Sequence, residues 1–294
     1  MKTTKTKLAK AITMALAGAA FSAGAVSTAS AETFYNTYSA PSASSTDGWT
    51  RIADTNGDGI GTGPESNGNS GLKLPWAGTP GNALPFGYKG SAILNWAVAI
   101  HTPGTQEVSS ADALANYGLS AEIDTGAGAW KDNTGTGWKH QTDIGLIKSD
   151  FDGLVRLNLT TLGNFNDNFG VTVFTGMDTT TANYSHHGGW NNATKPETTS
   201  NPFYAAGVGS GMEYLTHSAT VNDSAFNYLE FFAQAGQVYT IALGGNGVGR
   251  WNANVAGYEL KVSAISAVPV PGAVWLFGSA LAGFAGLNRR KLAA

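Results

Sequence analysis

The pattern of apolar and polar residues in the middle of the chain is typical of β-strands. Side chains alternate between the two faces of a strand, so a half-buried strand has apolar residues at every second position. A strand buried on both faces shows a short continuous apolar run instead. Seven segments have one of these patterns and predict strands: residues 93–100, 143–148, 153–160, 169–174, 226–232, 237–243 and 257–263.

The segments between these strands favour turns and very little helix. Ala235 and Gly236 predict a tight turn between the strands at 226–232 and 237–243. Residues 109–117 predict one short helix with Ser110 as its N-cap. Since no other segment between the two ends has a sustained 3.6-residue period, we expect an all-β protein. Its predicted architecture is an antiparallel β-sandwich of jelly-roll type, forming one domain over residues 32–267.

The first 31 residues have the three parts of a secretory signal peptide. Four lysines, at positions 2, 5, 7 and 10, precede an apolar, alanine-rich run at 11–26. The small residues Ala29-Ser30-Ala31 then form a cleavage site, so we expect the mature protein to begin at Glu32. Export is the prediction, with a signal helix preceding the β domain.

The last 27 residues, 268–294, follow a different pattern. An entry marked by Pro269 and Pro271 leads into an uncharged run of 16 residues, 272–287, and the chain then becomes basic at Arg289, Arg290 and Lys291. As a helix this run is roughly 24 Å long, whereas a hydrocarbon core is roughly 30 Å thick. It predicts a short transmembrane helix whose flanking residues reach the interface, with the basic cluster on the cytoplasmic side.

This C-terminal arrangement resembles the PEP-CTERM sorting tail, a bacterial signal that exosortase-type enzymes read. The residues that carry the resemblance are Val268-Pro269-x-Pro271, the block from Ala273 to Gly278 and the basic end. Val270 stands where the family has Glu, which puts cleavage of the tail in question. The resemblance implies an exosortase-type partner, anchoring in the inner membrane before processing, and delivery to the cell surface or the extracellular space. The alternative is a plain C-terminal anchor helix.

Charge and composition narrow the function of the exported part. Seven of the 17 basic residues and none of the 20 acidic residues lie in the two end segments, so the part between them carries a formal charge of −10. This charge argues against binding to nucleic acid, which needs a basic face. The chain has no cysteine, which excludes thiolate chemistry, and its 39 glycines fit short strands joined by turns.

Residues 54–65 match the calcium-loop pattern D-x-[DN]-x-[DN]-G-x5-E at every specified position. Alternate oxygen ligands converge on a hard cation, and a distal glutamate adds a bidentate carboxylate. The flanking sequence does not predict the two helices of an EF-hand, so we expect a free-standing loop that binds a structural calcium ion. The alternative is a solvated turn that uses the same residues for backbone reasons. The predicted ligands are Asp54, Asn56, Asp58 and Glu65.

A second metal site is predicted around Trp138 and His140, with His186 or His187 supplying a further imidazole. In a strand, residues 138 and 140 would lie on the same face, with indole and imidazole side by side. Imidazole is a good ligand for copper, zinc and nickel. A pair of histidines with low coordination number, in a chain that lacks cysteine, favours copper(I).

The Trp-x-His motif, followed by a further histidine about fifty residues on in a secreted, glycine-rich β domain, is similar to the surface copper(I)-binding proteins of methanotrophic bacteria. In that family two histidines bind copper, and the tryptophan of the motif is oxidised to kynurenine. The resemblance implies that Trp138 is the modified residue, His140 one ligand, and His186 or His187 the other. The alternative is that Trp138 belongs to the core or stacks on sugars, and that the adjacent histidines form a polar loop.

The many aromatic residues are compatible with a different function. Eight Trp and ten Tyr in a domain of this type are compatible with a matrix or adhesion protein that binds exopolysaccharide. Aromatic residues in all-β proteins, however, serve more often in the core. The sequence contains no G-x-S-x-G, H-E-x-x-H or P-loop motif, so we expect a protein that acts by binding and not as an enzyme.

Overall fold

The computed structural model of the chain describes residues 31–38, 52–53, 63–64, 76–90, 92, 94–132, 135–163, 168–180, 188–192, 201–204, 209–248 and 255–266. The chain divides into two units, residues 1–30 and 31–294, and every described residue lies in the second. The signal helix and the C-terminal apolar helix that we expected therefore lie outside the described residues. Among the residues described, no helix is long and apolar enough to cross a membrane.

Two large sheets make up most of the structure. The first has six strands in the order β1 (Glu32–Tyr35), β5 (Trp96–Ile100), β10 (Asp143–Ser149), β16 (Val238–Gly245), β12 (Phe169–Gly176) and β14 (Met212–Val221). The second has the order β15 (Leu229–Ala233), β11 (Gly153–Thr161), β17 (Ala256–Ser266) and β6 (Gly104–Val108), and β8 (Asp124–Thr125) pairs with β17.

In the part of the chain that the structure describes, the small elements are three two-stranded pairs, one α-helix and three 3-10 turns. The pairs are β2 (Thr37–Tyr38) with β7 (Ser120–Ala121), β3 (Ile52–Ala53) with β4 (Gly63–Pro64), and β9 (Gly137–Trp138) with β13 (Gly189–Trp190). The helix is α2 (Ser110–Tyr117), and the 3-10 turns are η1 (Pro80–Asn82), η2 (Pro85–Gly87) and η3 (Lys139–Gln141).

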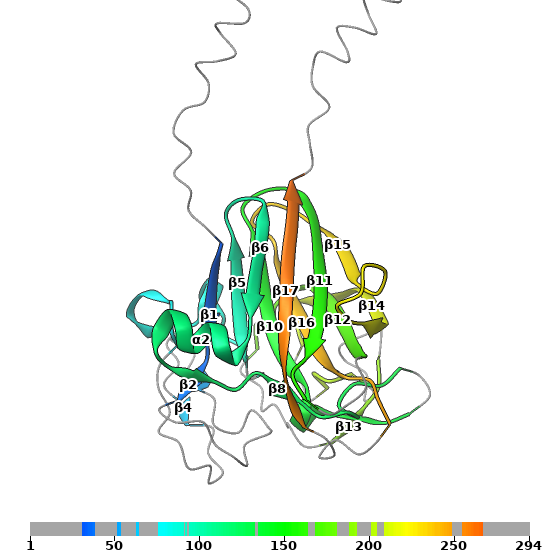
Figure 1. Cartoon of the computed structure of the whole chain (residues 1–294). Helices are drawn as coiled ribbons and strands as arrows, with labels where there is room; N and C mark the ends of the chain where they lie inside the picture. Colours follow the sequence, from blue (N-terminus) through cyan, green and yellow to red (C-terminus); the bar gives the residue numbers. More distant parts are fainter. Residues whose placement is uncertain are drawn as a thin grey trace, which may run out of the picture. The chain divides into compact units, whose positions relative to one another are not determined.

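The two large sheets share one core cluster, as the sheets of a β-sandwich do. Val98 and Ile241 of the first sheet and Leu157 and Leu260 of the second belong to this cluster. Figure 1 shows β11 and β17 in front of β10, β16 and β12. The prediction of a mostly β protein with antiparallel sheets is confirmed. Among the strand pairs of the described residues, one is parallel: β5 with β10.

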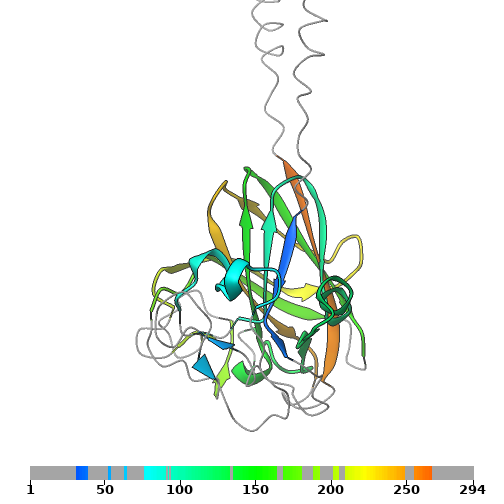
Figure 2. The same cartoon turned by 90° about the vertical axis from the view of Figure 1, so that its left-hand side faces the viewer.

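The central strands of the six-stranded sheet, β5, β10, β16 and β12, are largely buried on both faces. In β5, Trp96 and Val98 face the core shared with the second sheet, whereas Ala97 and Ala99 belong to a separate cluster on the other face. The segment 76–90 covers that other face, and Figure 2 shows it (cyan) on one side of β1 (blue) with β17 (orange) on the other. This explains why β5 is a continuous apolar run in the sequence.

Two sequence predictions are corrected in detail. The N-cap of α2 is Ser109 and not Ser110, because the Ser109 hydroxyl accepts the N–H of Asp112 at 2.9 Å. The turn at Ala235–Gly236 is confirmed, and Gly236 there has a φ of +78°. The strands that it joins, however, belong to different sheets, so the turn carries the chain across the sandwich.

A buried polar network links the two sheets. The Tyr258 hydroxyl of β17 donates to Asp143 Oδ2 at 2.6 Å and accepts from Trp96 Nε1 at 3.1 Å. Asn95 Nδ2 donates to the other oxygen of Asp143, and Asn95 Oδ1 accepts the N–H of Ile144 at 3.0 Å. The network therefore fixes β5 against β10 in the first sheet and both against β17 in the second.

Candidate functional site

The predicted copper motif lies on the small ladder formed by β9 and β13. Trp138 pairs with Gly189, and Gly137 pairs with Trp190. The strand ends at Trp138, and residues 139–141 form the 3-10 turn η3. Our expectation that Trp138 and His140 share one face of a strand is therefore wrong, because the alternation of side chains holds only within a strand.

A set of buried tryptophan and threonine side chains supports this ladder. Trp190 is 2% exposed, and its Nε1 donates to Thr142 Oγ1 at 3.0 Å, which in turn donates to the carbonyl of Trp138 at 3.0 Å. The ring of Trp130 meets that of Trp190 edge-to-face, with centroids 6.2 Å apart. The backbone around Trp138 is thus held from the inside by packed aromatic rings and hydrogen bonds.

The turn η3 is tied directly to the residue before β13. The N–H of Lys139 donates to the carbonyl of Gly188 at 3.2 Å. The Lys139 side chain is buried, its Nζ donates to the carbonyl of Tyr204 at 3.3 Å, and burial lowers the pKa of this ammonium group. Gln141, at the end of the turn, is 1% exposed, and its amide atoms have no hydrogen-bond partner among the described residues.

The structure describes only part of the predicted set of copper ligands. The backbone of His140 is part of η3, whereas His186 and His187 lie outside the described residues. Within the described ranges, no group of three His, Cys, Asp or Glu side chains could hold a metal ion.

The predicted calcium ligands also lie outside the described residues: Asp54, Asn56, Asp58 and Glu65. The structure describes the two short strands beside them. Ile52 pairs with Pro64 and Ala53 with Gly63, so the backbone just before Asp54 is paired with the backbone just before Glu65. The residues of the sorting tail, Pro269, Pro271, Arg289, Arg290 and Lys291, are outside the described ranges as well.

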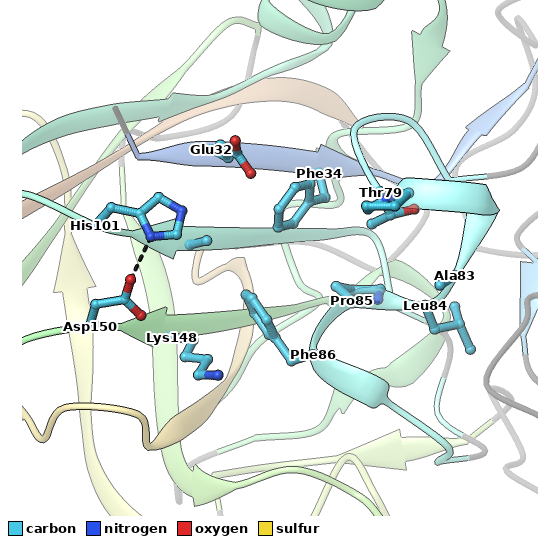
Figure 3. Close-up of a pocket in the computed structure, with 12 residues that line it drawn as sticks. Glu32, Phe34, Thr79, Ala83, Leu84, Pro85, Phe86, His101, Lys148 and Asp150 are labelled. Atoms are coloured by element: carbon cyan, nitrogen blue, oxygen red, sulfur yellow. Dashed lines mark hydrogen bonds and ion pairs between the residues drawn. The ribbon is translucent and has the colours of Figure 1, made fainter. Parts of the chain in front are cut away.

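The structure also contains a pocket that we did not predict. It lies between the first sheet and the covering segment 76–90, has a volume of about 260 Å³, and has charged groups at one end and apolar groups at the other (Figure 3). Its charged end contains Glu32, His101, Lys148 and Asp150. These residues come from three parts of the sequence, around positions 32, 101 and 148–150, and meet only because β1, β5 and β10 are neighbours, so no local signal could identify the pocket.

Two histidines that sequence reasoning left aside have defined partners. His101 Nδ1 lies 2.6 Å from Asp150 Oδ2 at the mouth of the pocket. His217 Nδ1 lies 2.6 Å from the hydroxyl of Tyr214, and its ring is 6.1 Å from that of Trp130.

No family profile matches the chain, and no curated relative matches it in sequence. Among solved structures, the chain is similar to CorA, a surface-associated copper-binding protein of Methylomicrobium album BG8, with 13% identity and a TM-score of 0.33. This match covers 57% of this chain and 98% of CorA. The chain is also similar to PliG of Aeromonas hydrophila, a periplasmic inhibitor of g-type lysozyme, with 8% identity and a TM-score of 0.24. That match covers 57% of this chain and 97% of PliG. Similarities at these TM-scores carry no argument about function.

Proposed function

We propose that this protein is exported and binds copper(I) through His140 and one of the two histidines His186 and His187, beside Trp138. The observation that carries the proposal is the hydrogen bond between the N–H of Lys139 and the carbonyl of Gly188. Each partner in this bond is the chain neighbour of a proposed ligand, His140 or His187. The residue before His140 and the residue after His187 are thus in direct contact, which supports pairing the two proposed ligand positions.

The chemistry of the residues present fits copper(I). Two imidazole nitrogens are suitable ligands for copper, and the chain contains no thiolate that would compete for it. The buried amide of Gln141, directly after His140, supplies a polar group that an ordered water or a ligand near the site could satisfy. Trp138 is the chemically oxidisable neighbour that the resemblance of the motif implies.

The proposal is tested by measuring copper in the exported protein after growth with added copper. We expect about one copper per chain in the wild type, and we expect its loss in His140→Ala and in one of the variants His186→Ala and His187→Ala. His101→Ala is the matched control, because His101 lies in the pocket on the first sheet and should leave copper unchanged. Circular dichroism must show that each variant is folded. Absence of copper from the wild type, or full copper in His140→Ala, overturns the proposal.

Trp138 provides an independent measurement. We expect mass spectrometry of the peptide that contains Trp138 to show oxidation in protein isolated with copper, and a lower oxidised fraction in His140→Ala. Equal oxidation of Trp138 and of a buried tryptophan such as Trp130 would indicate unspecific damage and remove this support.

A structural calcium ion at Asp54, Asn56, Asp58 and Glu65 is the second part of the proposal. It is supported by the complete sequence pattern and by the pairing of β3 with β4, which closes the segment between them. Removal of calcium should lower the melting temperature of the wild type but not that of Asp58→Ala. Equal melting temperatures of the wild type with calcium and with a chelator would exclude the site.

Export and sorting complete the proposed function. We infer that the signal peptide 1–31 directs export and that the tail 268–294 is read by an exosortase-type enzyme after insertion into the inner membrane. A chain that ends at residue 267 should be released, whereas the full chain should fractionate with membranes or the cell surface until it is processed. The carbohydrate-binding alternative gains no support from four of the five described tryptophans, because Trp76, Trp96, Trp130 and Trp190 are at most 2% exposed and serve as core, whereas Trp138 is partly exposed.

A further inference from the structure

The pocket under segment 76–90 has the walls of a small-molecule site. At its apolar end, the rings of Phe34 and Phe86 meet edge-to-face, with centroids 6.1 Å apart, and Leu84 and Pro85 continue the wall (Figure 3). Its volume of about 260 Å³ is slightly below the range of roughly 300–1,000 Å³ typical of pockets for drug-sized ligands. A compact ligand with one apolar group fits these dimensions.

The other end of the pocket carries charges of both signs. Glu32 and Asp150 are acidic, Asp150 is paired with His101 at 2.6 Å, and Lys148 Nζ lies 5.9 Å from the centre of the Phe86 ring. Cleavage at the predicted signal-peptidase site would add the new α-amino group of Glu32 at this end. The charged end of the pocket therefore has carboxylates that can accept from a ligand's ammonium group and a lysine that can donate to a ligand's carboxylate.

Phe86 is held in a strained backbone conformation that forms part of the wall. Its φ is +58°, and it is the one non-glycine residue with positive φ among the described residues. The preceding turn η1 uses Gly81 at its corresponding position, with a φ of +62°. A left-handed conformation is unfavourable for a residue with a Cβ, and such strain persists where the surrounding structure requires it. In η2 a phenylalanine occupies this left-handed position, and its ring lines the pocket.

A buried hydroxyl lies in the same wall. Thr79 Oγ1 is shielded from solvent and has no hydrogen-bond partner among the residues that the structure describes. Buried polar groups are normally satisfied, so this hydroxyl is available to a ligand atom or to an ordered water.

We propose that this pocket binds a small zwitterion with an apolar side chain, of the class of the apolar α-amino acids. The ammonium group of the ligand would face Glu32 and Asp150, its carboxylate would face Lys148, and its side chain would lie against Phe34 and Phe86. This site is separate from the proposed copper site and does not depend on it.

The charged groups and the apolar wall of the pocket disfavour simple anions, simple cations and sugars as ligands. A simple anion would meet two carboxylates, and a simple cation would compete with Lys148 for the face of Phe86. A sugar would place hydroxyl groups against Leu84 and Pro85, which offer no hydrogen-bonding side chain. Only a ligand that carries both charges next to an apolar group satisfies the two ends together.

The test is calorimetric titration of the full exported protein, freed of copper because amino acids chelate this metal. The probes are L-phenylalanine, phenethylamine, 3-phenylpropionate and glucose. We expect L-phenylalanine to bind with a Kd below about 1 mM and each singly charged analogue to bind roughly tenfold more weakly. No measurable binding of glucose is expected.

Three variants assign the contacts. Lys148→Met should weaken L-phenylalanine binding roughly tenfold while leaving phenethylamine unchanged, and Asp150→Asn should weaken phenethylamine. Phe86→Asn places a residue that tolerates positive φ in the turn, so it should remain folded and lose binding of all three aromatic probes. Lys261→Met is the matched control, because Lys261 lies on β17 and pairs there with Glu259.

The outcomes separate this proposal from the copper site. His140→Ala should bind L-phenylalanine as well as the wild type does, whatever its copper content. The proposal is overturned if L-phenylalanine does not bind the wild type, if it binds no better than both singly charged analogues, or if Lys148→Met binds it with unchanged affinity.

Discussion

The two large sheets of this protein differ in how they meet solvent. The six-stranded sheet has an apolar cluster on each face, whereas the second sheet packs only its inner face and leaves its outer face to water. On that outer face, one row of paired residues is apolar and exposed: Ile265 at 52%, Leu154 at 41% and Phe232 at 50%. The same type of element thus serves as a central layer in one place and as an outer layer in the other.

This difference explains where the pocket forms. A covered sheet face needs a second layer, and here segment 76–90 provides it with prolines, turns and aromatic rings. Side chains of the sheet and of this irregular layer do not interdigitate as regularly as two sheets do, and the pocket lies between them. The outer face of the second sheet has no such cover among the described residues, so its exposed apolar row faces solvent, as does the neighbouring ion pair of Arg156 with Glu230.

The sharpest test compares one leucine from each outer face. Leu146 is fully buried under the covering layer, so Leu146→Ala should lower the free energy of unfolding by about 2–5 kcal/mol. Leu154→Ala, on the open face of the second sheet, should lower it by less than about 1 kcal/mol, because the side chain is already half in water. Denaturant unfolding at equilibrium measures both. Equal losses would show that the two outer faces are not different.

Glycines in the two sheets give a second comparison. A Cβ on Gly145 would collide with the indole ring of Trp96, so Gly145→Ala should cost about 1–3 kcal/mol or prevent folding. In β17 of the second sheet, a Cβ on Gly257 would make ordinary contacts, the nearest at 3.5 Å to the carbonyl oxygen of Ile123. Gly257→Ala should therefore leave stability within about 1 kcal/mol of the wild type. Thermal unfolding distinguishes them, and a stable Gly145→Ala would mean that Trp96 can move.

Breaking the buried polar network between the two sheets should lower the free energy of unfolding by less than Leu146→Ala does. Tyr258→Phe removes two buried hydrogen bonds, to Asp143 and from Trp96, while it keeps the ring in the shared core. We expect a loss of about 1–3 kcal/mol, since buried donors and acceptors lose their partner. A Tyr258→Phe protein as stable as the wild type would show that the network does not contribute to stability.

The sequence allowed the strands to be predicted better than the sites. The segments 143–148, 153–160 and 169–174 are strands as expected, because burial imposes either alternation or a continuous run on the residues themselves. The turn at Lys139–Gln141 was missed because nothing in its residues distinguishes a 3-10 turn from the end of a strand. The pocket was missed because it depends on the order of strands in the sheet and on a phenylalanine in a conformation that its own sequence disfavours.

The smallest expected change in the free energy of unfolding comes from an ion pair on the solvent-facing outer side of the second sheet. Arg156 of β11 pairs with Glu230 of β15 at 3.1 Å, and its guanidinium lies 3.9 Å from the centre of the Tyr228 ring. Both charged side chains are about one-third exposed, at 36% and 28%, so solvent screens the pair. Arg156→Met should therefore cost no more than about 1 kcal/mol, and the difference from the wild type should shrink as salt is added. Arg156→Lys keeps the charge but loses the planar stacking on Tyr228, and an intermediate stability would assign part of the effect to that ring. A loss in Arg156→Met as large as that of Leu146→Ala, and independent of salt, would show that this face is covered in the folded protein after all.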